Sequence, residues 1–221
     1  MRLCQLYIEQ CISDWKIAKR HVRFLVPDSF VVIRMVSLPI DLKEDEIKGY
    51  LYMEIGTSIH LPFEDPVFDY TLMDSDTNNR QILLFAAPED IVRENMGLFD
   101  EVRLKAVAAD ISSLALYRYY NQLEPASENQ NLLVIQFDLL EVNVSIIEEN
   151  IPVFTRHISM EVNRENWTHS LTNESSFTLN VTGDKDEAFI SIKDAYTQIE
   201  KVINFYQYSL NQGKQQVEKI L

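Results

Sequence analysis

The sequence predicts a mixed α/β fold, because segments with helical periodicity alternate with short segments rich in β-branched residues along its 221 residues. The composition, with 46% hydrophobic and 24% charged residues, is typical of a soluble globular protein with a core of its own. No apolar run approaches the ~18 residues that a membrane span needs. The two cysteines and the lack of a signal-like start indicate a reducing, cytoplasmic compartment.

The first half of the chain shows the alternation most clearly. A helix is expected over 2–20, where apolar residues recur at helical spacing and the segment ends in Lys19-Arg20, and another over 41–59, where Ile47, Leu51 and Ile55 repeat every four residues. β-branched and aromatic runs predict the strands between the helices. The remaining expected elements are strands over 22–26, 30–36, 67–73, 81–87 and 102–108, and helices over 88–99 and 110–121.

The second half begins after a polar segment, 122–131, which contains Pro125 and is expected to link a unit over 1–121 to one over 132–221. Strands are expected over 132–137, 142–148 and 152–158, and a long helix over 192–210. The segment 161–189 is polar and poorly periodic, so no element is predicted there.

Charge is distributed unevenly. The net charge is −14, and residues 41–160 carry eight basic against twenty-two acidic side chains, whereas residues 1–40 carry six basic and three acidic ones. A field this negative repels a phosphate backbone, so nucleic acid is not an expected partner.

The motifs that usually carry catalysis or bind metal are missing from the sequence. The four histidines fall in no zinc-binding frame, no CxxC or GxSxG occurs, and the five glycines form no phosphate-binding cluster. The segment from Asp74 to Asn78 resembles the start of a calcium loop, but the sixth position is Asn79 and the twelfth is Phe85, so a hairpin turn is predicted instead. We therefore expect no metal and no cofactor.

Several short strings are informative when they are taken together in their order and spacing. They are residues 26–34, 38–39, 61–65, 69–70, 83–87, 107–116, 133–138, 153–156 and 199–206. Together they resemble the PilM family of type IV pilus assembly proteins, and the resemblance covers roughly residues 20–160 and 195–210.

The resemblance implies an actin-like ATPase (RNase H-like) fold, similar to that of FtsA, with an inserted strand-helix-strand-strand subdomain that would correspond to residues 22–87. Compared with the family, the fold is expected to be truncated at both ends. In the family a phosphate loop with a glycine follows a strand-ending Asp. Here Asp138 is followed by Leu139, Leu140 and Glu141, whose side chains obstruct phosphate and whose Glu141 repels it. A degenerate nucleotide site and no enzymatic activity are therefore expected.

The resemblance also implies a partner. PilM proteins are cytoplasmic scaffolds that bind the N-terminal tail of the single-span membrane protein PilN, so a PilN-like protein and other pilus platform proteins are the expected partners. The chain would then lie at the inner face of the membrane without inserting into it. Two alternatives remain open: a fragment of a functional actin-like ATPase, and a cytoplasmic module of a type II secretion platform similar to GspL.

A partner-binding face is expected on the inserted subdomain, because two of its strands are apolar on both faces although the subdomain offers one helix. Val31, Ile33 and Met35 are expected to face that helix. The residues expected to line the outward groove are Phe30, Val32, Arg34, Ile82 and Leu84. The alternative is that the rest of the first unit covers this face within the chain.

Overall fold

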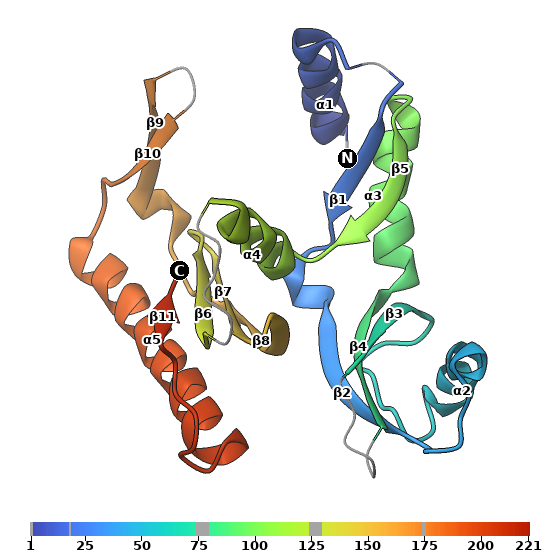
Figure 1. The fold of residues 1–221 in the computed structure, drawn as a ribbon. Helices are drawn as coiled ribbons and strands as arrows, with labels where there is room; N and C mark the ends of the chain where they lie inside the picture. The colour runs from blue at the N-terminus through green and yellow to red at the C-terminus, as the bar shows by residue number, and fades with distance from the viewer. Residues whose placement is uncertain (1, 18, 74–79, 124–129, 174–175) are drawn as a thin grey trace. The chain divides into compact units, whose positions relative to one another are not determined.

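The computed structural model describes residues 2–17, 19–73, 80–123, 130–173 and 176–221 (Figure 1). The chain forms two compact units, Met1–Pro125 and Ala126–Leu221, and the division falls inside the segment predicted as a linker. Each unit combines helices and strands, which confirms the predicted mixed α/β class. The predicted turn and calcium-like segment at 74–79 lie outside the described residues.

The first unit contains two small sheets. Its elements are α1 (Arg2–Trp15), β1 (His21–Leu25), β2 (Val32–Leu38), α2 (Ile47–Glu54), β3 (Pro66–Leu72), β4 (Arg80–Pro88), α3 (Glu89–Glu101), β5 (Lys105–Asp110) and α4 (Ser112–Leu123), with short 3-10 turns at Asp28–Phe30 and Glu44–Glu46. One sheet has the antiparallel order β2-β4-β3, and the other is the parallel pair β1-β5. The sequence analysis placed β1 at the start of the inserted segment 22–87. In the structure β1 pairs with β5, which lies outside that segment, and it does not join the sheet β2-β4-β3.

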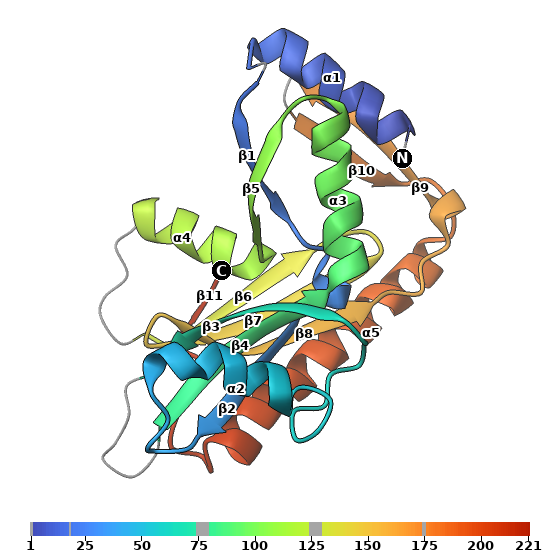
Figure 2. The same ribbon diagram turned by 90° about the vertical axis from the view of Figure 1, so that its right-hand side faces the viewer.

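Helix α2 covers one face of the three-stranded sheet (Figure 2). Its two fully buried side chains, Ile47 and Leu51, pack against Leu38, Ile82 and Leu84 of the strands. The helix is shorter than the predicted 41–59, because Ile55 already has an extended backbone and Gly56 has a φ of 88°. Ile59 still joins the core, from the loop that follows the helix.

Helix α3 covers one face of the parallel pair. Phe24 and Val26, which lie in and just after β1, pack with Val92 of α3 and with Ala87 near the end of β4. Strand β4 thus contributes side chains to both cores of the first unit. The following strand begins at Lys105, three residues later than predicted, because Arg103 has a φ of 60° and the amide of Leu104 closes the end of α3 onto the carbonyl of Phe99.

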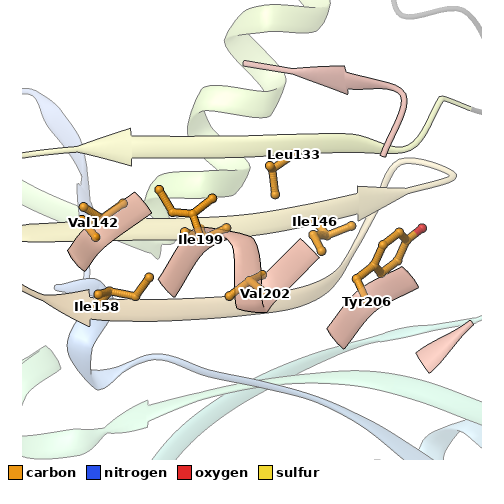
Figure 3. Packing of buried hydrophobic residues seen from close by; sticks show 9 residues of the cluster. Leu133, Val142, Ile146, Ile158, Ile199, Val202 and Tyr206 are labelled. Atoms are coloured by element: carbon orange, nitrogen blue, oxygen red, sulfur yellow. The ribbon is translucent and has the colours of Figure 1, made fainter. Parts of the chain in front are cut away.

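The second unit is built around a four-stranded sheet of order β11-β6-β7-β8, one face of which is covered by α5. Its elements are β6 (Leu132–Phe137), β7 (Glu141–Glu148), β8 (Ile151–Ser159), β9 (Trp167–Asn173), β10 (Ser176–Val181), α5 (Lys185–Asn204), a π-helical turn (Phe205–Leu210) and β11 (Lys219–Ile220). Figure 3 shows the core between sheet and helix. The labelled residues are Leu133, Val142, Ile146, Ile158, Ile199, Val202 and Tyr206.

Three features of the second unit differ from the prediction. The segment 161–189 contains the antiparallel hairpin β9-β10, and the C-terminal segment adds β11 parallel to β6. Helix α5 begins seven residues earlier than predicted, because the side chain of Asp184 accepts hydrogen bonds from the amides of Asp186 and Glu187. An N-cap of this kind stabilises a helix start that the apolar pattern alone does not reveal.

Tyr206, in the π-helical turn that follows α5, is a fully buried polar side chain that ties this turn to the sheet. Its hydroxyl lies 3.2 Å from Glu148 Oε2 and donates a hydrogen bond to it. Burial, followed by the neighbouring charge and hydrogen bond of Glu148, raises the pKa of Tyr206 above its ordinary value. The folded state therefore retains the phenol proton more strongly than the unfolded chain does.

Replacing Leu51 with Ala tests the core under α2. Leu51 is fully buried, and truncating such a side chain leaves a cavity, so the free energy of unfolding is expected to fall by about 2–5 kcal/mol. Met53, two residues further along the same helix, is 69% exposed, and Met53→Ala is expected to change the free energy of unfolding by less than about 0.5 kcal/mol. Urea titration followed by circular dichroism measures both, and equal effects would contradict the packing described.

The raised pKa of Tyr206 predicts a loss of stability at alkaline pH. The contribution is fully present below the unfolded-state pKa of about 10 and is lost as pH rises above it, at up to about 1.4 kcal/mol per pH unit. Tyr206→Phe removes the ionisable proton, so the variant is expected to lose less stability than the parent between pH 9 and 11, whatever its stability at pH 7. Parallel slopes for the two proteins would contradict the assignment.

Candidate functional site

An open apolar groove lies within the first unit, where the three-stranded sheet meets the parallel pair. Its volume is about 360 Å³. Most of its lining is apolar, and the lining residues are Phe24, Val26, Val31, Val67, Phe68, Asp69, Phe85, Ala86, Ala87, Val92, Met96, Ala106, Val107, Ala108, Ala109, Asp110 and Ile111. At the rim, Val67, Met96 and Val107 are 36%, 38% and 48% exposed, so apolar side chains are accessible from solvent.

The groove follows from the pairing of β4. Register pairs Val67 with Ala87 and Asp69 with Phe85, and residues opposite one another on antiparallel strands share a face of the sheet. This is the face that does not carry the α2 core. Strand β5 and helix α3 supply the remaining wall. Among the described strands, β3 and β5 each pair with one neighbour only, so each has a free edge.

The polar groups that line the groove are two carboxylates. Asp110 forms an ion pair with Arg118 and accepts a hydrogen bond from the amide of Ile111 at 2.8 Å. Asp69 is exposed, and its carboxylate accepts a hydrogen bond from the amide of Tyr70 at 2.9 Å. Because a cation already neutralises Asp110, Asp69 is the carboxylate with charge to offer a ligand. The groove therefore suits an apolar ligand that also carries a positive charge.

The structure shifts the predicted alternation of the strands by one residue. Val32 opens β2 and pairs with Ala86, which places Val32, Arg34 and Val36 on the α2 face. Ile33 and Met35, which the sequence assigned to the helix, lie on the opposite face with Leu83 and Phe85. The pairing of Val32 with Ala86 sets this alternation, because Ala86 has the same parity on β4 as Ile82 and Leu84 of the α2 core, while the 3-10 turn Asp28–Phe30 leaves Phe30 outside the strand. A shift of one residue moves every side chain of a strand to the other face.

The five predicted partner-binding residues accordingly do not form one groove. Ile82 and Leu84 are fully buried in the core under α2, so they cannot line a surface. Arg34 donates a hydrogen bond to the carbonyl of His60 at 2.7 Å and so holds the loop after α2. Phe30 and Val32 line a separate open cavity of about 660 Å³ with Phe63, Ile91 and Arg93 among its other residues. Of the two predicted strands only β4 lines the groove, through Phe85, Ala86 and Ala87, and the remaining lining comes from segments that the prediction did not include.

The predicted degenerate phosphate loop is a tight turn between β6 and β7. The amide of Asp138 donates to the carbonyl of Glu141 at 2.9 Å, and the amide of Leu139 donates to the Asp138 carboxylate at 2.6 Å. The carbonyl of Leu140 accepts from the amide of Met160. Two backbone donors of the turn are therefore engaged within the chain, and the carboxylates of Asp138 and Glu141 flank it.

Two other features are absent from the described residues: a membrane-spanning helix and a cluster of metal ligands. None of the helices there has both the length and the apolar character needed to cross a membrane. In the same part of the chain, no three His, Cys, Asp or Glu side chains are gathered in a way that could hold a metal ion.

Comparison with solved structures places the fold. A chain of a PilM–PilN type IV pilus biogenesis complex matches with a TM-score of 0.59 and 18% identity over 71% of this chain and 47% of that one. This chain thus spans about half the length of that PilM–PilN chain. The cytoplasmic domain of EpsL, an inner-membrane component of the type II secretion system of Vibrio cholerae, matches at TM-score 0.46 and 14% identity, covering 68% of this chain and 55% of that one.

A more distant match is a Bacteroides thetaiotaomicron protein with an actin-like ATPase fold and unknown function, at TM-score 0.30 and 10% identity over 91% of this chain and 67% of that one. None of the curated proteins compared with the sequence matches it. The model of one protein family, described as type IV pilus assembly protein PilM, matches residues 4–176. That range is most of the chain and includes the whole groove. The resemblance found in the sequence is confirmed: the chain belongs to the PilM family of type IV pilus assembly proteins.

Proposed function

We propose that this chain is a non-catalytic scaffold of a type IV pilus or competence assembly platform. In this proposal it binds the cytoplasmic N-terminal tail of a PilN-like inner-membrane protein in the groove between the two sheets of the first unit. The observation that carries the proposal is the open apolar groove itself, with its accessible rim and its free strand edges. Membership of the PilM family and the PilM–PilN complex among the similar structures support this choice of partner.

The groove has the features by which an extended peptide is recognised. A peptide backbone adds to a free strand edge through main-chain hydrogen bonds, and alternate side chains enter neighbouring pockets. Strands β3 and β5, which line the groove, each offer such an edge. Each apolar peptide side chain that leaves water against Phe85, Ala87 or Met96 would contribute about 1.5–3 kcal/mol before the cost of ordering the peptide.

Charge favours a tail that is basic as well as apolar. Asp69 and Asp110 are the charged residues of the lining, and Arg34, which the sequence analysis placed in the partner-binding groove, is engaged with the carbonyl of His60 instead. Cytoplasmic segments beside a membrane span are enriched in Lys and Arg. Such a tail would meet Asp69 while its apolar residues fill the groove. The partner would then hold the scaffold at the inner face of the membrane.

The proposal of a non-catalytic role rests on the turn at Asp138. A phosphate site needs several backbone N–H groups directed at one anion, and here the amides of Asp138 and Leu139 already have acceptors within the chain. The two carboxylates beside the turn add repulsion.

Met96→Asp tests the groove. Met96 lies at the rim, so the folded variant would place a carboxylate against the apolar part of a bound tail, and an uncompensated charge that loses water costs several kcal/mol. Binding of a synthetic cytoplasmic tail peptide of the PilN-like protein from the same genome, measured by calorimetry, is expected to weaken by more than about tenfold.

Phe30→Asp is the matched control. Phe30 is 40% exposed, about as much as Met96, and lines the separate cavity that contains Val32. Because Phe30 lies outside the groove, its replacement is expected to change peptide affinity by less than about threefold. The two substitutions introduce the same charge at similar exposure, so the comparison isolates the location of the charge. Circular dichroism checks that both variants fold. If Phe30→Asp abolishes binding and Met96→Asp does not, the groove is the wrong site.

A second experiment tests the absence of nucleotide binding. Calorimetry with Mg-ATP is expected to give no heat of binding at micromolar concentrations, because the turn at Asp138 offers too few free donors. Leu140→Gly alone is not expected to restore binding, since it leaves the hydrogen bonds of the Asp138 and Leu139 amides in place. Micromolar affinity of the unmodified chain would overturn the non-catalytic proposal and revive the ATPase alternative.

A further inference from the structure

A basic patch occupies one end of the first unit. None of its residues lines the groove, although Arg23 and Lys105 directly precede the groove residues Phe24 and Ala106 in the chain. We define the patch by six side chains that are all exposed: Lys16, Lys19, Arg20, Arg23, Arg103 and Lys105. They come from two segments, 14–23 and 100–105, which also contain the acidic residues Asp14, Asp100 and Glu101. Six cations against three anions leave these segments positive in a protein whose net charge is −14.

The fold brings the two segments together. His21 pairs with Lys105 in the parallel sheet, and the amide of Lys105 donates to the carbonyl of Arg20 at 3.0 Å. Arg103 lies in the turn that leads from α3 into β5. In Figures 1 and 2 the end of α1, the start of β1 and the turn between α3 and β5 lie at the same end of this unit.

The cations of the patch are not used to stabilise the fold. Within the described residues, none of the six forms an ion pair, whereas Arg80, Arg93 and Arg118 of the same unit each pair with a carboxylate. Clustering unpaired cations costs free energy through mutual repulsion, and an external anion relieves this repulsion. The arrangement therefore indicates an anionic ligand.

The surroundings of the patch favour a lipid surface over a peptide. The residues of the patch line none of the four cavities described in this unit, so none of those four offers a peptide a groove beside the patch cations. Trp15, directly before Lys16 in the chain, is 68% exposed. An exposed tryptophan beside several lysines and arginines is the combination by which proteins adsorb to the headgroup region of an anionic bilayer.

We propose that the basic patch and Trp15 bind the surface of an anionic membrane directly. The adsorption is peripheral and electrostatic, with Trp15 entering the headgroup layer and no helix crossing the bilayer. It is independent of the tail-binding groove. Salt screens the attraction beyond the Debye length of about 8 Å at physiological ionic strength, so the patch must be in contact with the membrane to act.

Vesicle sedimentation tests the proposal with the full 221-residue chain and no partner. Binding is expected with vesicles of phosphatidylcholine and phosphatidylglycerol in a 7:3 ratio at low salt, and much less with phosphatidylcholine alone. The triple variant Arg20→Glu, Arg23→Glu, Lys105→Glu is expected to lower the partition coefficient by about tenfold or more, because contact with an anionic leaflet depends on each cation near its surface.

The matched control is Lys193→Glu, Lys201→Glu, Lys214→Glu, three exposed lysines of the second unit. It changes the net charge by the same amount and is expected to reduce binding by less than about threefold, because the proposed adsorption depends on the patch cations that contact the leaflet and not on the overall charge. Binding of the tail peptide by both triple variants reports that the first unit remains folded.

Trp15→Phe gives a second measurement that does not depend on charge. The parent is expected to show a blue shift of tryptophan emission on adding the anionic vesicles, and the variant, which keeps only Trp167, is expected to lose it. No binding to anionic vesicles, equal binding to neutral ones, or equal loss in the two triple variants would each overturn the proposal. Loss confined to binding of an acidic protein, with vesicle binding unchanged, would show that the patch serves a protein partner instead.

Discussion

The packing of β4 on both of its faces is the interaction on which the first unit depends. Ile82 and Leu84 enter the core under α2, while Ala87 joins Phe24, Val26 and Val92 under α3. One strand therefore holds together two small sheets, each of which would be only marginally stable alone. The groove exists because β4 is apolar on the side that α2 does not cover, and because β5 and α3 close only part of that side.

Much of this fold could be predicted from periodicity, and the errors have local physical causes. Strand 132–137 was predicted with the bounds that β6 has, and the helices around Leu51 and Ile199 were found by their four-residue repeat. Hairpin β9-β10 was missed although Phe177, Leu179 and Val181 alternate with polar residues, a period that the shortness of the segment and its many Thr and Asn residues obscured.

The candidate site was harder to predict than the fold, because a site depends on which alternate side chains of each strand face the groove. The strings of residues 30–36 and 81–87 have apolar residues at both odd and even positions, so the composition does not decide which of them face α2. The pairing of Val32 with Ala86 decides it, and the sequence does not specify that pairing. Of the two strands chosen for the site, β4 lines the groove, but through Phe85 and Ala87 instead of Ile82 and Leu84. The excess of basic residues over 1–40 indicated four of the six patch residues. The other two, Arg103 and Lys105, are brought beside them by the pairing of β1 with β5.

The free edges of β3 and β5 have a consequence for the protein before it meets any partner. An unpaired strand edge presents a row of N–H and C=O groups that can pair with another copy of the same edge. Because Val67 and Val107 are accessible on these two strands, a vacant groove is also prone to self-association. A partner bound in the groove would cover these edges. It would therefore protect this chain from self-association for as long as it stays bound.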